Sequence, residues 1–245
     1  MILQPGIKIS GGVRFEASIV TQSIVASGLQ FNLSSAPTSG TTWTDTSGNG
    51  RNGTLQGSAS YVSTNGGGIK LNNSAYTGTD YISVPYNIST STVTVELVAS
   101  FNPTSNWATI WGNEGYSAGR GYYATMQTTT SITYGKPNSS SSETISASNA
   151  VRHWIFVIND TTQSLYLNGS QVGASDTVTK QTLFVTTEFL FGARHTNGGT
   201  GATDKMNNTN AALQPVFYQM RLYNRALSVP EITQNYNAMK AIYSI

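Results

Sequence analysis

The stretch of residues 216–240 constrains the fold most strongly, because a strand pattern gives way there to a helix pattern. Residues 217–223 alternate between two faces, which is typical of a half-buried strand. The alternation places Phe217, Gln219, Arg221 and Tyr223 on one face and Tyr218, Met220 and Leu222 on the other. The sequence therefore predicts a core strand shortly before the helix signal.

The helix signal begins at Ser228. Ser228 and Glu231 have the S-x-x-E spacing of a capping box, in which the two side chains take amides that lack helical partners. Pro230 lies in the first turn, where its missing amide removes no helical hydrogen bond. Leu227 and Ile232 are placed to form a hydrophobic staple. We expect one short helix in a chain that is otherwise strand-like.

Composition favours a single all-β domain and excludes several functions. The 245 residues suit one sandwich, and the net charge of +2 is too small for nucleic-acid binding. No stretch approaches the ~20 apolar residues of a membrane span, and without cysteine there are no disulfides or thiolate metal sites. The first residues do not resemble a signal peptide, so we expect synthesis in a host cytoplasm. The hydroxyl-rich composition suits either an extracellular, glycan-contacting surface or simple solubility.

Residues 1–28 are expected to form an arm outside the main domain. Apolar residues alternate there on either side of a Ser-Gly-Gly turn, which predicts a small hairpin. An exposed apolar hairpin of this kind favours aggregation unless other protein surface packs on it. It either packs on its own domain or docks on a neighbouring subunit. We favour docking, expect a chain that begins at Ser27 to fold, and assign assembly to Ile7, Ile9, Val13 and Phe15.

Three segments resemble concanavalin A-like, laminin-G-like jelly-roll domains. They are TWTDTSGNGRNGTL at the opening, WIFVINDTTQSLYLNG at the central hairpin and RLYNRALSVPEITQNYNA at the close. The resemblance implies an all-β fold over residues 29–245, a two-sheet antiparallel jelly-roll sandwich with a short C-terminal helix. Strands are expected near residues 29–33, 69–71, 81–84, 93–101, 107–111, 122–126, 153–159, 165–168 and 189–192, and residues 139–142 are expected to form a polar tip.

Two groups of oxygen-bearing residues are candidate ligands for Ca²⁺, the one cofactor considered. Asp45 and Asn49 lie in a turn-rich segment, and Asp204 and Asn208 lie in a long polar loop. Ca²⁺ takes six to eight oxygen ligands. The first segment also fits a turn closed by its own hydrogen bonds, and the spacing of the second matches no established calcium loop.

A separate group of aromatic and polar residues could hold a sugar, because sugars bind aromatic faces beside a few polar groups. The alternative is that the aromatic members fill the core and that the histidine is an ordinary loop residue. The candidate ligand-binding residues are Trp111, Asn113, Tyr116, Arg120, Tyr122 and His195.

Catalysis is not expected. Glucanases that share the resemblance carry an E-x-D-x-x-E strand, and glycoside hydrolysis needs two carboxylates roughly 5–10 Å apart. In this sequence the glutamates each stand alone on their segments. Neither a G-x-S-x-G elbow nor a phosphate-binding loop is present.

The resemblance and the leading arm together suggest a structural protein of a tailed bacteriophage. We expect a non-enzymatic virion surface protein, a capsid decoration or tail-associated protein, that contacts host glycans. Its partners would be other virion proteins, bound through the arm, and further copies of itself. The alternative is a carbohydrate-binding or hydrolase-associated module of a bacterial secreted protein.

Overall fold

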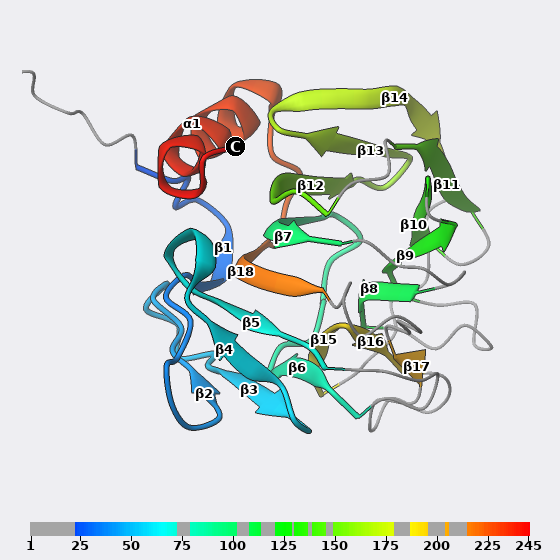
Figure 1. Cartoon of the computed structure of the whole chain (residues 1–245). Coiled ribbons are helices and arrows are strands. Elements are labelled where there is room, and N and C mark those ends of the chain that lie inside the picture. The colour runs from blue at the N-terminus through cyan, green and yellow to red at the C-terminus, as the bar shows by residue number, and fades with distance from the viewer. Residues whose placement is uncertain are drawn as a thin grey trace, which may run out of the picture.

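The computed structural model describes residues 23–72, 79–101, 108–113, 121–128, 130–136, 139–145, 149–178, 187–195, 204–205 and 215–245. Two antiparallel sheets face each other as a sandwich, and one helix packs on the outside (Figure 1). This arrangement confirms the predicted jelly-roll fold class.

The helix-side sheet is the one that carries the helix. In spatial order it contains β14 (Ser170–Thr177), β13 (Thr162–Leu167), β12 (Arg152–Ile158), β7 (Val93–Ser100), β18 (Val216–Tyr223), β5 (Gly68–Lys70) and β4 (Ser60–Val62), with β1 (Leu29–Leu33) also paired to β18. The second sheet contains β11 (Ser139–Thr144), β10 (Ser131–Lys136), β9 (Tyr123–Thr128), β8 (Ala108–Gly112), β15 (Phe189–Phe191), β6 (Tyr81–Val84), β3 (Gly53–Gln56) and β2 (Thr42–Trp43). A small ladder joins β16 (Ala193–Arg194) to β17 (Asp204–Lys205).

The serine-rich segment at residues 139–142 corrects one prediction. It is not a tip but part of β11, which pairs with β10 along its whole length and places Ser141 opposite Tyr134. Serine has little strand preference of its own, so the backbone ladder to β10 determines this strand rather than its side chains.

Strand β18 corrects a second prediction, the strict alternation of its faces. Phe217 lies in the core between the sheets together with Met220 and Leu222, whereas Tyr218 packs on the helix side. The register against β7 shifts between Phe217 and Gln219, which marks a β-bulge. The extra residue moves Phe217 to the opposite face from the one predicted.

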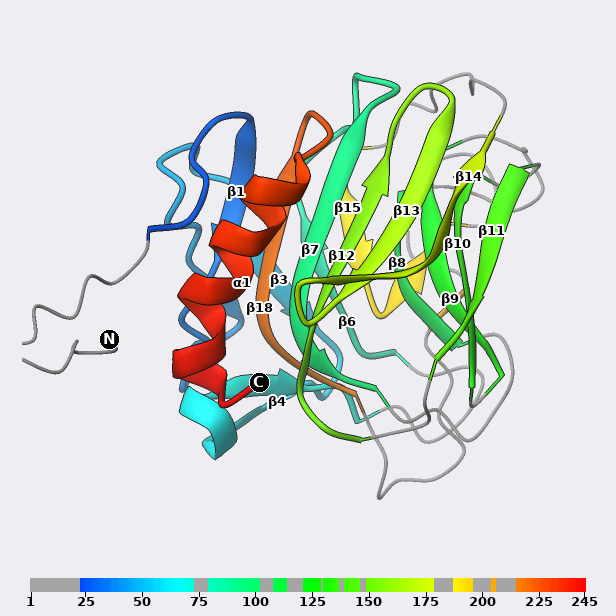
Figure 2. The same ribbon diagram turned by 90° about the horizontal axis from the view of Figure 1, so that it is seen from above.

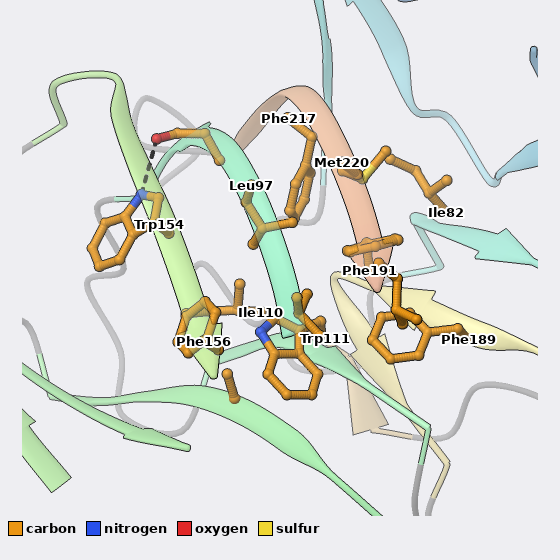
Figure 3. Packing of buried hydrophobic residues seen from close by; sticks show 14 of the residues in the cluster. Ile82, Leu97, Ile110, Trp111, Trp154, Phe156, Phe189, Phe191, Phe217 and Met220 are labelled. Carbon is orange, nitrogen blue, oxygen red and sulfur yellow. Dashed lines mark hydrogen bonds between the residues drawn. The ribbon is translucent and has the colours of Figure 1, made fainter. Parts of the chain in front are cut away.

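Aromatic side chains fill the space between the two sheets (Figure 3). Trp111 stacks on Phe189 with ring centroids 5.7 Å apart, and Phe156 meets Trp111 edge-on at 5.4 Å. Trp154 is buried as well, and its indole N–H donates to the Ala99 carbonyl at 3.2 Å. The core therefore joins both sheets into one packed unit.

Helix α1 (Val229–Tyr243) lies across the outer face of the helix-side sheet (Figure 2). It begins with the predicted capping box, in which Glu231 accepts from the Ser228 amide at 2.8 Å. The buried residues of the helix are Ile232, Asn235, Met239 and Tyr243. Within the described residues, no helix is long and apolar enough to cross a membrane.

The last part of the predicted arm contacts this helix. The Ser23 carbonyl accepts from Gln234 at 2.7 Å, and the Val25 amide donates to Asn235 Oδ1 at 2.8 Å. Val25 is buried. Ser23 and Val25, which the sequence analysis places in the arm, thus contact the domain. The assembly residues Ile7, Ile9, Val13 and Phe15 lie outside the described residues.

Candidate functional site

The predicted sugar-binding group is partly inside the core. Trp111 and Tyr122 are fully buried and belong to the main hydrophobic cluster. Asn113 is buried as well, and its Oδ1 accepts from the Tyr122 amide at 2.9 Å, which joins the ends of strands β8 and β9. Tyr116 and Arg120 lie outside the described residues. Neither buried ring offers a face to solvent.

His195 lies at the same end of the second sheet. It directly follows β16 in the chain. Strand β16 lies next to β8: a Cβ atom added at Gly112 of β8 would lie only 2.7 Å from the Cβ of Arg194 in β16. His195 is fully buried, and its Nε2 lies 3.4 Å from the Glu188 carbonyl oxygen. The structure thus brings His195 and Asn113 to one region, but in the interior.

The first predicted calcium group forms a turn held by its own hydrogen bonds. Asp45 Oδ1 accepts from the amides of Asn32 and Ser47, each at 2.9 Å. Its Oδ2 accepts from the Arg51 amide and the Ser47 hydroxyl, also at 2.9 Å. Burial acts to raise the pKa of Asp45, but these hydrogen bonds outweigh it and lower the pKa. Protein donors therefore already contact both carboxylate oxygens.

Asn49 uses its side-chain amide to brace the same turn, donating to the carbonyls of Leu29 and Gln30 at 3.1 and 3.0 Å. In the second predicted group, Asp204 pairs through its backbone with Arg194, and Asn208 lies outside the described residues. Among the residues described, no three His, Cys, Asp or Glu side chains gather where they could hold a metal ion.

A buried charged cluster that the sequence analysis did not anticipate lies between the helix-side sheet and α1. Glu96 Oε1 accepts from Arg221 at 2.6 Å and lies 2.7 Å from His153 Nε2. Its Oε2 accepts from Asn235 at 2.7 Å. The ion-paired side chains are at most 1% exposed. We call Glu96, Arg221, His153 and Asn235 the buried cluster.

The charge state of Glu96 follows from these contacts. Burial alone would raise its pKa, but the attraction of Arg221 and the hydrogen bond with His153 lower the pKa to about 2. Asn235 also connects outward, donating to the Tyr223 hydroxyl at 3.0 Å and accepting from Val25. Sealed from solvent in this way, the carboxylate holds the helix and cannot meet a substrate.

An open crevice lies at the C-terminal end of α1, beside the 3₁₀ turn η1 (Thr64–Gly66). Its volume is about 430 Å³, within the range of small-molecule sites. None of the described residues that line it is charged. The residues of this α1 crevice are Ser34, Ser35, Ala36, Thr38, Tyr61, Gly66, Gln219, Met239, Ile242 and Tyr243. They come from segments far apart in the sequence, which explains why no sequence motif marked them.

Comparisons with known proteins agree with this architecture. The family model of the concanavalin A-like lectin/glucanases superfamily matches residues 75–233. A search of curated proteins found no match.

Similar solved structures come from botulinum neurotoxins. The receptor binding domain of the C/D mosaic serotype has a TM-score of 0.65 at 16% identity, over 86% of this chain and 51% of that chain. The serotype D binding domain has a TM-score of 0.64 at 15% identity, over 86% of this chain and 52% of that chain. A type C structure is described with the finding that cell entry depends on two ganglioside molecules. It has a TM-score of 0.65 at 13% identity, over 86% of this chain and 51% of that chain. The chain spans about half the length of these domains, and at such identities the likeness shows the fold.

Proposed function

Because the chain belongs to the concanavalin A-like lectin/glucanases superfamily, we propose that it is a non-enzymatic, glycan-binding domain of a virion surface protein. As a capsid decoration or tail-associated protein, it recognises host glycans and performs no chemistry on them.

Structural use of the carboxylates carries the non-enzymatic part of the proposal. Glu96 is sealed in the buried cluster, and Asp45 closes a turn. Glu231 caps the helix and pairs with Arg225 at 2.6 Å. Asp80 accepts from the amides of Ser58 and Asn72, both at 2.8 Å. These carboxylates hold the fold, whereas hydrolysis of a glycosidic bond requires two that reach the substrate.

Among the described residues, Glu143 and Asp176 form a pair of carboxylates that favours a rival, hydrolytic function. Burial, and then the negative charge of Asp176, raise the pKa of Glu143. A raised pKa beside a second carboxylate is a feature of glycosidase acids. The residues lie on β11 and β14, the edge strands of their sheets, where charged side chains also serve to block edge-to-edge association. We assign them this structural role.

Glycan contact is supported by superfamily membership and by the low charge of the chain, of which only 10% is charged. The ganglioside dependence described for the type C toxin belongs to a protein of similar fold. The virion assignment is supported by the apolar residues of the leading arm. The alternative context is a carbohydrate-binding or hydrolase-associated module of a secreted bacterial protein.

Three measurements test the proposal. The full chain should release no reducing sugar from β-glucans or agar-like polymers, and turnover that disappears in Glu143→Gln would contradict the non-enzymatic assignment. On a glycan array the chain should retain at least one glycan. Mass spectrometry should find the chain in purified phage particles; its presence only in culture supernatants free of particles would favour the secreted module.

A further inference from the structure

We propose that the α1 crevice binds a neutral saccharide, with Tyr61 and Ile242 contacting its apolar C–H surface. This inference rests on the proposed glycan-binding function and assigns it a place on the molecule.

Exposed apolar side chains point to this crevice. Among the described residues, the large apolar side chains that remain exposed are Tyr61 at 37%, Val229 at 55% and Ile242 at 59%. Tyr61 and Ile242 both line the crevice, although they come from β4 and from the end of α1. Figures 1 and 2 both place the end of α1 beside the turn that joins β4 to β5. A pair of exposed apolar groups on a concave surface is typical of a binding site.

The tyrosine ring lies against the turn at Gly67. Gly67 has φ +98°, and a Cβ there would lie 2.7 Å from the Tyr61 hydroxyl oxygen. Only glycine therefore lets the ring rest against the turn at this distance. A ring fixed before binding gives a flat apolar face at little further cost in entropy.

Polar groups on the floor are fixed as well. The Tyr243 hydroxyl donates to Gln219 Oε1 at 3.2 Å, and Gln219 Nε2 donates to Asn32 Oδ1 at 3.1 Å. Asn32 Oδ1 in turn accepts from Arg221 Nε at 2.9 Å, which ties the floor to the buried cluster. An amide nitrogen carries two protons, and the described residues provide an acceptor for one of those on Gln219.

The character of the lining selects the ligand class. The described lining contains no charged side chain, which disfavours anionic ligands, because these need paired cations or ordered amides. Ser35 and Thr38 are exposed and add hydroxyl groups at the rim. Hydroxyls beside apolar faces match a sugar, which presents both surfaces, better than an acyl chain, which presents only one.

The test uses the full chain on an array that carries neutral oligosaccharides, sialylated oligosaccharides and immobilised laurate. Tyr61→Ala should weaken binding to the retained neutral glycan about tenfold, as expected for the loss of an aromatic contact. Ile242→Ser should weaken it several-fold. Val229→Ser is the matched control, because it removes an equally exposed apolar residue at the other end of the same helix. It should leave binding unchanged, and all three variants should keep the circular dichroism spectrum of the folded parent.

The outcomes separate the site from the function. Glycan binding that survives both Tyr61→Ala and Ile242→Ser would overturn this site and leave the proposed function standing. Retention of only sialylated glycans, or of laurate alone, would overturn the neutral-saccharide assignment. Binding to nothing on the array would overturn the proposed function and this site with it.

Discussion

Glu96 and Arg221 pair where water cannot reach them, each with 1% of the side chain exposed. Removing two charges from water costs several kcal/mol per ion, and the cost is offset only when hydrogen bonds satisfy the remaining atoms. Asn235, His153 and Asn32 make those bonds here. The stability of the cluster therefore depends on all of its members, because the loss of one leaves buried polar atoms of the others without a partner.

Arg221→Met should destabilise the protein by about 3–5 kcal/mol, because it leaves the Glu96 carboxylate buried and uncompensated. Arg225→Met is the matched control, since it breaks the partly exposed pair with Glu231 and should cost about 1 kcal/mol or less. Urea unfolding of the two variants measures the difference. Equal losses would show that the buried pair has no special role.

Acid should weaken the fold through the same carboxylate. The pKa of Glu96 lies near 2 in the folded protein, below its ordinary value of 4.5. A lowered pKa means that the stabilisation is fully present above about pH 4.5 and is lost as the pH falls from there through 2. The free energy of unfolding, followed from pH 5 to about pH 2, should therefore fall more steeply in the parent than in Glu96→Gln. Parallel curves would contradict the assignment.

Asp45→Ala should lower the melting temperature, because four donors lose a carboxylate acceptor and each such bond contributes about 1 kcal/mol. Since those donors already occupy the carboxylate, adding calcium or a chelator should not change the melting temperature of the parent or of the variant. Thermal melts with and without calcium give the answer. A parent protein that melts higher in calcium, by an amount that the variant loses, would make this turn a metal site.

At the scale of elements, α1 and the segment before β1 stabilise each other against the sheet. Val25 packs with Ile232 and Tyr223 in a small cluster outside the main core. Ile24 packs near Met239 and Tyr218 in a neighbouring cluster. The helix therefore packs on the sheet and also on residues 24–25, which the sequence analysis assigned to a separate arm.

Two truncations separate these roles. A chain that begins at Ser23 keeps the described contacts of this segment with α1, so the expected docking role of the arm predicts that it unfolds at the same urea concentration as the parent. A chain that begins at Ser27, which the sequence alone predicts to fold, should lose about 3 kcal/mol, since it lacks the buried Val25 and its bond to Asn235. Equal stability of the two chains would show that residues 23–26 belong to the arm and do not stabilise the domain.

At the scale of the whole molecule, one hydrophobic cluster joins strands of both sheets. Trp43, Trp111 and Trp154 lie inside it and are at most 1% exposed. The buried cluster then connects the helix-side sheet to α1. No described layer has a core of its own that could persist after the others separate.

Unfolding should therefore be a single cooperative transition. Tryptophan fluorescence reports the core between the sheets, and far-ultraviolet circular dichroism reports strands and helix together. The two signals should change at the same urea concentration. An earlier loss of helical signal, with the fluorescence unchanged, would show that α1 is only loosely attached.

Local patterns in the sequence were enough for features whose partners are close in the chain. The Ser228–Glu231 capping box depends on contacts within a few residues, and the turn around Asp45 depends on such contacts in part; both were visible as residue spacing. The resemblance added the sandwich, and the family model matches residues 75–233 of the chain.

Tertiary structure alone decided the features whose partners are distant. Glu96 and Arg221 are 125 residues apart, and Glu96 and Asn235 are 139 apart. Their meeting depends on strand register and on how the helix docks, and residue periodicity encodes neither. The bulge at Phe217 reversed a predicted face for the same reason, since pairing with β7 fixes it. The α1 crevice likewise exists only once β4, β18 and α1 are in place, because a concave surface is a property of packed elements rather than of any one of them.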